Sequence, residues 1–309
     1  MAEAKDDIVL SIRGMCKSFG RNRVLDHINL DVKRGTVMGL MGENGAGKST
    51  MMKCLFGTYQ KDEGKIFLNG KEISFSGPKD ALENGIAMVH QELNQCLERS
   101  VIDNLFLGRY PVNSMGVVDE GQMKKKPADL FRKLGMTVNL TQPMRNMSVS
   151  QRQMCEIAKA ISYNAQVIVL DEPTSFLDIR HKLELLTILK QMVLDHQLTV
   201  IMSLHELDLA QKISDKVICV HGEYIEKYGA PEEIFTSEYT RKLYGITRGS
   251  YNAAFGCVEM DPPRGEPQVF VIGGNGSGIP YYRKLQRQGI PFAAGVLHTN
   301  DVDCQVAGA

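Results

Sequence analysis

Residues 42–49, GENGAGKS, match the pattern G-x-x-x-x-G-K-[ST], which wraps a polyphosphate. Such a loop needs glycines where a Cβ would keep phosphate oxygens from the backbone N–H groups. Lys48 is expected to neutralise the β- and γ-phosphates, and the Ser49 hydroxyl is expected to ligate Mg²⁺. The predicted helix after the loop would point its positive amino end at the phosphates. A chance glycine-rich turn is the alternative.

A pair of acids follows a second apolar run, residues 167–172, VIVLDE. Ligands bind an α/β sheet at the carboxyl ends of its strands, so Asp171 and Glu172 are expected beside the phosphates. Because side chains alternate along a strand, the two acids can divide the work. We expect Asp171 to hold Mg²⁺ and Glu172 to orient and polarise the attacking water, which is much of what phosphoryl transfer requires. A turn or helix-capping role is the alternative.

Strands and helices are predicted to alternate around these motifs. Residues 8–34 favour strands, and GKIFLNGKEI favours a hairpin that turns at Asn69-Gly70. Apolar residues at helical spacing predict a mainly helical region over residues 96–165 and a helix from about Ile179 to Asp195. A strand is expected just before His205. This order predicts a mostly parallel sheet covered on both faces.

The composition changes near residue 248. A proline-rich stretch predicts a linker, and VFVIGGNGSG, IPYYRKLQRQG and IPFAAGVL then predict one βαβ unit. The glycines of residues 272–278 lack a following Lys-Ser/Thr and do not fit G-x-G-x-x-G, so a tight turn is expected there. We expect His298, Asp301, Asp303 and Cys304 to be solvated rather than to bind a metal, because their spacing is poor for ligands.

Composition narrows the class of protein. The 309 residues include 36 Lys+Arg and 36 Asp+Glu, so the net charge is zero, which disfavours binding to nucleic acid or to anionic lipid by bulk charge. We find neither an apolar run of about 18 residues nor a secretory signal in MAEAKDDIVL. The seven cysteines are scattered, which suits reduced thiols in the cytosol.

Over about residues 8–246 the ordered motifs resemble the ATP-binding domain of the ABC-type ATPases. Residues 42–49 match the Walker A loop and residues 167–172 the Walker B strand. Gln91 matches the Q-loop, and His205 matches the switch histidine. The other matches are Ser148-Val149-Ser150-Gln151 for the signature sequence, residues 175–178 for the D-loop, and Phe19 for the aromatic that stacks on adenine.

The resemblance implies a P-loop NTPase of ABC type. Its mostly parallel sheet would carry an antiparallel β subdomain and a helical subdomain over about residues 92–150, all within residues 1–247. Residues 248–309 would form a linker and a short, incomplete βαβ-like extension. Two such domains sandwich two ATP molecules head to tail, each closing its signature sequence on the other's phosphates.

The family's site residues carry over by position. The implied catalytic residues are Glu172, His205, Gln91 and Lys48, and the implied Mg²⁺ ligands are Ser49, Gln91 and Asp171. The implied ATP-binding residues are Phe19, Gly42, Asn44, Gly45, Ala46, Gly47, Lys48, Ser49, Thr50, Ser148, Ser150, Gln151 and Asp178.

Further stretches of the sequence resemble, within this family, the ATPases of importers. VHQELN, SVIDNLFLGRYP and MSVSQRQMCEIAKAISYNA are similar to galactose/ribose-type importer ATPases, although that class usually carries two such domains in one chain. The second half is more similar to iron-chelate and cobalamin importer ATPases. The signature departs from the usual pattern, because Val149 and Ser150 replace two glycines.

The implied function is the ATP-hydrolysing subunit of an importer, with a monosaccharide as the first substrate hypothesis and an iron chelate or cobalamin as the second. The implied partners are transmembrane permease subunits, a second ATP-binding domain (identical or paralogous) and, indirectly, a solute-binding protein. No nucleic acid is expected, and the chain would lie at the inner face of the cell membrane. The alternatives are a non-transport ABC ATPase and a non-hydrolytic ATP-binding module.

Overall fold

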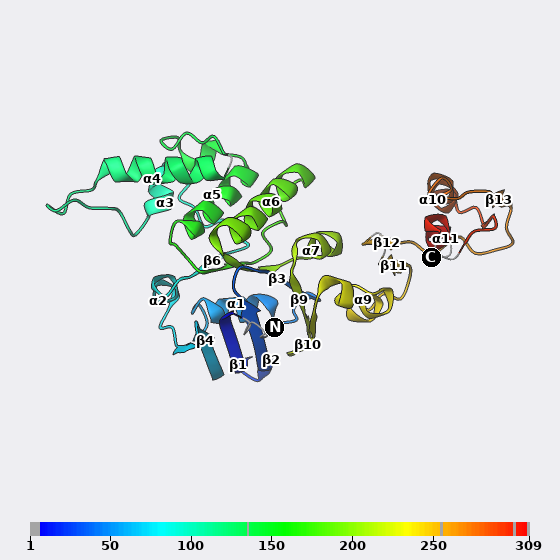
Figure 1. Cartoon of the computed structure of the whole chain (residues 1–309), viewed down its shortest axis with the longest axis horizontal. Coiled ribbons are helices and arrows are strands. Elements are labelled where there is room, and N and C mark those ends of the chain that lie inside the picture. Colours follow the sequence, from blue (N-terminus) through cyan, green and yellow to red (C-terminus); the bar gives the residue numbers. More distant parts are fainter. Residues whose placement is uncertain (1–6, 135, 254–255, 299–300, 308–309) are drawn as a thin grey trace, which may run out of the picture. The chain divides into compact units, whose positions relative to one another are not determined.

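The structure is a computed structural model that describes residues 7–134, 136–253, 256–298 and 301–307 (Figure 1). The chain divides into two compact units. Unit 1 comprises Met1–His205 and Ile213–Tyr228, and unit 2 comprises Glu206–Lys212 and Gly229–Ala309. The sequence placed a domain boundary at residues 247 and 248, and that division stays a prediction.

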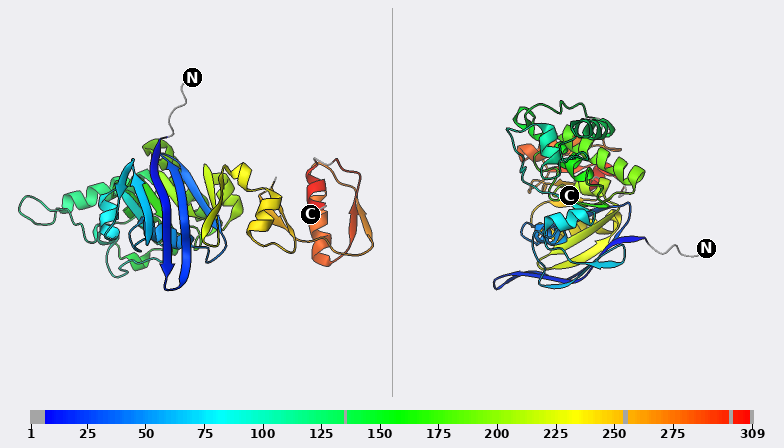
Figure 2. Two further views of the ribbon diagram at one scale, coloured as in Figure 1. Left: turned by 90° about the horizontal axis from the view of Figure 1, so that it is seen from below. Right: turned by 90° about the vertical axis from the view of Figure 1, so that its left-hand side faces the viewer.

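Unit 1 contains an antiparallel four-stranded sheet in the order β2-β1-β4-β5. Its strands are β1 (Ile8–Phe19), β2 (Asn22–Lys33), β4 (Glu63–Leu68) and β5 (Lys71–Ile73). The long strands β1 and β2 run side by side (Figure 2). Asn69 and Gly70 join β4 to β5 with φ angles of 52° and 76°, which is the left-handed backbone that an Asn-Gly hairpin turn requires.

A six-stranded sheet forms the centre of unit 1. Its order is β10 (Tyr224–Gly229), β9 (Lys216–His221), β3 (Val37–Gly42), β8 (Thr199–Ser203), β7 (Val167–Leu170) and β6 (Ile86–Val89). The β9–β3, β3–β8, β8–β7 and β7–β6 pairs are parallel. Every residue of β3, β6, β7 and β8 is buried, as expected for strands covered on both faces.

Helices complete unit 1. Three accompany the sheets: α1 (Lys48–Leu55), α2 (Pro78–Glu83) and α6 (Ile179–His196). The helical region comprises α3 (Val101–Phe106), α4 (Glu120–Lys133), the 3₁₀ turn η1 (Met144–Asn146) and α5 (Val149–Ile161). This region lies on the opposite side of unit 1 from β1, β2 and β4, and it has an apolar core of its own (Figures 1 and 2).

Unit 2 holds the remaining elements. Its helices are α7 (Leu207–Ile213), α8 (Pro231–Ile234), α9 (Ser237–Leu243), α10 (Ile279–Gln288) and α11 (Val302–Ala307). Its strands are β11 (Ser250–Asn252), β12 (Cys257–Glu259), β13 (Val269–Val271) and β14 (Phe292–Ala294). The predicted βαβ unit is confirmed, because β13 and β14 pair in parallel around α10. Among the described residues, none of the helices is both long and apolar enough to cross a bilayer.

The stretch predicted as a linker is partly ordered. Strands β11 and β12 form an antiparallel pair within it. Tyr251 is only 1% exposed, and the carboxylate of Glu259 pairs with Arg283 at 2.6 Å, so side chains anchor a segment that has little apolar periodicity. The prolines follow these strands, in residues 260–268, which form neither helix nor strand.

Candidate functional site

The glycine-rich loop joins the buried strand β3 to helix α1 at the carboxyl end of the parallel sheet. Gly42 and Gly47 have φ angles of 141° and 86°, which favour glycine. A Cβ on Gly47 would lie 2.8 Å from the carbonyl oxygen of Val24, and one on Gly42 would clash with the carbonyl oxygen of Val220. The loop therefore requires glycine at both of its ends.

Lys48 lies beneath this loop and is only 6% exposed. Its Nζ donates hydrogen bonds to the carbonyl oxygens of Gly42 at 2.7 Å and Glu43 at 2.8 Å. Burial lowers the pKa of Lys48 from its ordinary value, and the nearby carboxylates, Glu172 first, oppose that effect. An ammonium group has three N–H donors, so one remains for an anion in the loop.

Ser49 and Asp171 meet although they are distant in the sequence. The Ser49 hydroxyl donates to Asp171 Oδ1 at 3.0 Å, and Asp171 is 3% exposed. The Ser203 hydroxyl, at the end of β8, donates to the same oxygen at 3.2 Å. The hydroxyl oxygen of Ser49 and the carboxylate of Asp171 are the kind of hard oxygen ligands that Mg²⁺ prefers.

Three side chains hold the carboxylate of Glu172. Gln91 Nε2 donates to Glu172 Oε2 at 2.6 Å, and the Ser175 hydroxyl donates to the same oxygen at 3.1 Å. Nε2 of His205 lies 2.6 Å from Glu172 Oε1. The backbone of Glu172 is left-handed, with a φ of 48°, and its N–H donates to the Ser203 hydroxyl at 2.8 Å. A non-glycine residue in this conformation is held there by its surroundings, as is common at functional sites.

The glycine-rich loop and Glu172 line a small pocket of about 140 Å³. Its lining combines loop residues predicted to bind ATP with the predicted catalytic acid: Asn44, Gly45, Gly47, Lys48, Ser49, Thr50 and Glu172. Ala46, in the same loop, is buried, and its N–H donates to the Glu43 carbonyl at 3.3 Å. Backbone amides, a lysine and an acid around one small space suit the terminal phosphates of a nucleotide.

Phe19, predicted to stack on adenine, lies at the end of β1 and is 44% exposed. Its ring meets the edge of Tyr59, with centroids 5.2 Å apart, and Lys17 Nζ lies 5.4 Å from the ring centroid. The exposed part of the ring leaves surface on which a base could stack.

The signature residues lie at the amino end of α5. Ser148 caps the helix by accepting from the Gln151 N–H at 3.2 Å, and the Gln151 side chain accepts from the Ser148 N–H at 3.0 Å. Ser150 is only 8% exposed, and its hydroxyl lies 2.9 Å from that of Ser148. Ser148, Val149 and Gln151 are exposed.

Asp178 caps α6 instead of joining the loop. It accepts from the His181 N–H at 2.9 Å and contacts His181 Nδ1 at 2.8 Å. The hydrogen bond from the His181 N–H is the main cause of a lowered Asp178 pKa. Within the described residues, no hydrogen bond joins Asp178 or the signature residues to the glycine-rich loop, so their role in binding ATP stays a prediction.

Sequence reasoning missed two hydroxyls, those of Ser203 and Ser175. Ser203 is fully buried and links Asp171 to the backbone of Glu172. Its position at the end of the strand before His205 was the only indication in the sequence. Ser175 lies within the D-loop match, in which only Asp178 was predicted to be a site residue.

The second glycine-rich segment, in unit 2, forms a turn whose backbone N–H groups are bound by the protein's own acids. The N–H groups of Gly276 and Gly278 each donate to Asp303 at 2.8 Å. The expectation that Asp303 is solvated is wrong, because its side chain is fully buried. The loop donors would otherwise lack acceptors, which explains why a carboxylate lies there.

Comparison with known proteins identifies the fold. The family model described as ABC transporter matches residues 25–175, which include both the loop and the acids. This chain carries an ABC-type ATP-binding domain. The predicted P-loop NTPase fold of ABC type is thereby confirmed. Among solved structures, the ABC domain is similar to cbiO1 from Clostridium perfringens, with a TM-score of 0.66 and 26% identity over 76% of this chain and 94% of that chain.

Curated relatives share the ABC domain at higher identity. The galactose/methyl galactoside import ATP-binding protein MglA of Treponema denticola is 58% identical over 211 residues, which are 68% of this chain and 42% of that protein. MglA of Salmonella typhimurium is 50% identical over 186 residues, or 60% of this chain and 37% of that protein. The chain therefore spans less than half the length of these relatives.

Proposed function

We propose that this chain hydrolyses ATP as the motor subunit of an ABC importer whose solute is a monosaccharide. The observation that carries the proposal is the position of Glu172. Its carboxylate borders the pocket of the glycine-rich loop and is held there by Gln91, Ser175 and His205. A general base beside a phosphate pocket suits hydrolysis better than binding alone, so this arrangement favours an ATPase over a non-hydrolytic module.

The loop residues bind and neutralise the nucleotide. The N–H groups of residues 43–47 and the free donor of Lys48 donate hydrogen bonds to the phosphate oxygens, and Phe19 supports the base. Ser49 and Asp171 fit a magnesium ion, which when bound spreads the charge of the β- and γ-phosphate oxygens. Gln91 Nε2 donates to Glu172, and the amide oxygen of Gln91 is the atom that would ligate magnesium.

Glu172 prepares the attacking water. Its carboxylate accepts a hydrogen bond from the water and aligns it with the γ-phosphorus atom, while His205 fixes the other carboxylate oxygen. Lys48 stabilises the charge that develops as the bond between the β- and γ-phosphates breaks.

A second ATP-binding domain completes each site. Ser148 and Val149 are exposed at the amino end of α5, where they are free to meet the γ-phosphate on a partner domain. Ser150 is buried beside Ser148, so the serine that replaces a glycine leaves the outer face of the signature accessible.

The proposed solute and the remaining proposed partners are inferred from the curated relatives. Their names describe galactose and methyl galactoside import, which favours a monosaccharide over an iron chelate or cobalamin. Import requires transmembrane permease subunits and delivery by a solute-binding protein, and the ATPase would work at the inner face of the membrane.

Two measurements test the proposal. The purified chain should release phosphate from ATP only with Mg²⁺ present, and absence of hydrolysis would favour the binding module. A tagged chain should co-purify with a permease from membranes, and vesicles holding that complex should take up labelled galactose on addition of ATP. Uptake of cobalamin or an iron chelate instead would contradict the proposed solute, and an active ATPase that co-purifies with no permease would favour the non-transport class.

A further inference from the structure

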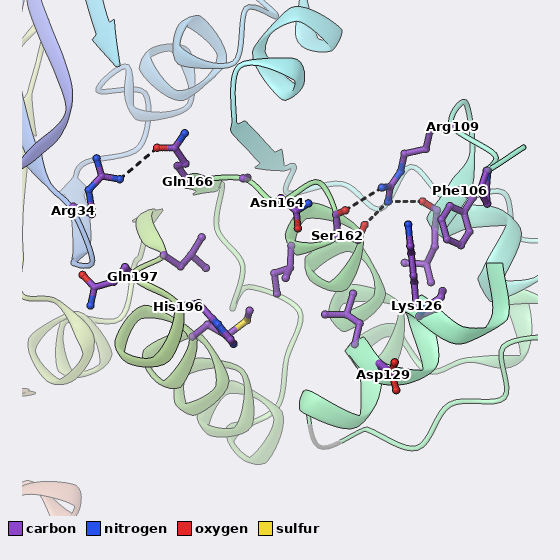
Figure 3. Close-up of a pocket in the computed structure, with 18 residues that line it drawn as sticks. Arg34, Phe106, Arg109, Lys126, Asp129, Ser162, Asn164, Gln166, His196 and Gln197 are labelled. Atoms are coloured by element: carbon purple, nitrogen blue, oxygen red, sulfur yellow. Dashed lines mark hydrogen bonds between the residues drawn. The ribbon is translucent and has the colours of Figure 1, made fainter. Parts of the chain in front are cut away.

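A cavity of about 790 Å³ lies in unit 1 (Figure 3), and it shares no lining residue with the phosphate pocket. Gln166 and Leu198 line it, and they directly precede β7 and β8. The cavity is therefore at the amino ends of the parallel strands, whereas the glycine-rich loop follows the carboxyl end of β3. Its volume falls in the range of pockets that hold small molecules.

The wall of this cavity combines an apolar floor with a basic rim. Leu105, Ile161 and Met192 contribute apolar surface. Arg109 and Lys126 contribute positive charge, whereas Arg34 also lines the cavity but pairs with Asp7 at 2.8 Å. Asp129 is the one carboxylate in the lining. That carboxylate already pairs with Arg132 at 2.7 Å. Figure 3 shows Arg109 and Lys126 on the same side of the cavity.

Arg109 is the most informative residue of the rim. Its guanidinium carbon lies 3.9 Å from the ring centroid of Tyr163, and the group donates to the carbonyl oxygens of Leu105 at 2.9 Å and Ser162 at 3.2 Å. Its Nε is buried without an acceptor, and burial lowers its pKa. Among the described residues, Arg109 has no carboxylate within ion-pair distance. Arg109 is half-buried, and the carbonyl groups and rings around it carry no full negative charge, so an anion would offset its partial desolvation.

We propose that the cavity binds a small amphiphilic anion, an apolar or aromatic group that carries a carboxylate, sulfonate or phosphate. The anionic group accepts from Arg109 and Lys126, and the apolar part covers Leu105, Ile161 and Met192. An uncharged apolar ligand would leave Arg109 without a counter-ion. A small hydrophilic anion would leave the apolar side chains of the cavity exposed to water.

The position of the cavity suits a ligand that regulates ATP hydrolysis. This part of the proposal rests on the proposed ATPase function. The signature residue Ser148 caps helix α5, which ends about 20 Å away at Ile161 in the lining of the cavity. The ligand would also join α4 of the helical region to α6 and to the start of β7. It would thus restrain the helical region against the parallel sheet and slow ATP turnover.

The binding test uses 8-anilinonaphthalene-1-sulfonate, an aromatic sulfonate whose fluorescence rises in apolar sites, with the full chain. Lys126→Gln and Arg109→Gln should each raise its Kd about tenfold, as expected for loss of a charged hydrogen bond. Lys125→Gln is the matched control, because Lys125 is an exposed lysine on the same helix that does not line the cavity, and it should bind as the wild type does.

Two further measurements distinguish the contribution of charge to probe binding from the contribution of the cavity volume. N-phenyl-1-naphthylamine lacks the sulfonate, so its Kd should not respond to Lys126→Gln. Ala165→Leu fills part of the cavity without changing any charge, and it should weaken both probes. Because Arg109 also binds the carbonyl groups of neighbouring residues, the folding of Arg109→Gln is checked by thermal unfolding. If that variant does not fold, the Kd of Lys126→Gln decides the test, because Lys126 is exposed.

The proposal is overturned if the sulfonate binds equally to Lys126→Gln and wild type, or if ATP displaces it, since displacement would place it in the phosphate pocket. Binding without any fall in ATP hydrolysis would overturn the regulatory step alone. A chain that hydrolyses no ATP at all would instead refute the proposed function, and the probe titrations, which need no ATP, would still judge the cavity.

Discussion

Glu172 Oε1 lies 2.6 Å from His205 Nε2, and the second oxygen of the same carboxylate receives hydrogen bonds from Gln91 and Ser175. The acid is therefore oriented from three segments of the chain. Each of them follows a strand of the parallel sheet: β6 precedes Gln91, β7 precedes Glu172 and Ser175, and β8 precedes His205. The sheet assembles this group because the carboxyl ends of its parallel strands meet at one edge.

Replacing the base tests its role directly. Glu172→Gln keeps the size of the side chain and removes its charge, so ATP binding should persist while turnover falls by at least about a hundredfold. The variant should also accumulate as an ATP-bound dimer on gel filtration, because the two domains close without hydrolysis. Undiminished phosphate release would refute the assignment.

The lysine of the loop should control affinity. Lys48→Ala removes the cation beneath the phosphates, so the Kd for ATP should rise about 10- to 100-fold in calorimetry. Lys53→Ala, in the last turn of the same helix, serves as the control and should bind ATP normally. Equal affinities for Lys48→Ala and the wild type would contradict the proposed contact.

Ser203 is predicted to position both acids. Ser203→Ala removes the acceptor of the Glu172 N–H and a donor to Asp171, leaving buried polar groups unsatisfied. We expect unfolding to become easier by about 1–3 kcal/mol and kcat to fall while KM for ATP changes little. Ser76→Ala, at an exposed serine, is the control. A variant that loses stability but keeps the wild-type kcat would show a purely structural role.

His90 should make stability depend on pH. Burial, with a smaller effect from Lys53, lowers its pKa below the ordinary 6.5. Below pH 6.5 the unfolded chain therefore binds more protons at this residue than the folded chain, so its contribution to stability is lost as pH falls towards the lowered pKa. In urea unfolding at pH 7.5 and pH 5, His90→Asn should lose less stability than the wild type. An equal loss would contradict this explanation.

The thiols should differ in reactivity. Burial raises the pKa of Cys54 to about 11 and that of Cys155 to about 12, while Cys96 is exposed. Because the thiolate is the nucleophile, iodoacetamide at pH 7.5 should modify Cys96 long before the two buried thiols, as judged by mass spectrometry of peptides. Cys96→Ser should remove that early modification. Rapid labelling of Cys155 in the folded chain would argue against the burial of this helix face.

Local sequence was sufficient for features that depend on neighbouring residues. Asn69-Gly70 predicted its hairpin because both positions adopt left-handed backbone. The run before Asp171 predicted a buried strand, and β7 (Val167–Leu170) is buried throughout. In the proline-rich stretch local reasoning was insufficient, because Glu259 is anchored by Arg283, which is distant in the sequence.

Tertiary structure decided the contacts between distant segments. The register of β7 against β8 pairs Leu170 with Met202, which brings Ser203 beside Asp171, and no local pattern encodes that register. Gln91 and Glu172 are 81 residues apart, yet their side chains meet. Likewise the cavity at Arg109 exists only because α4, α5 and α6 pack around it. The motifs specified which groups could act on a phosphate, whereas the packing of the sheet and helices determined which of them lie within reach of one another.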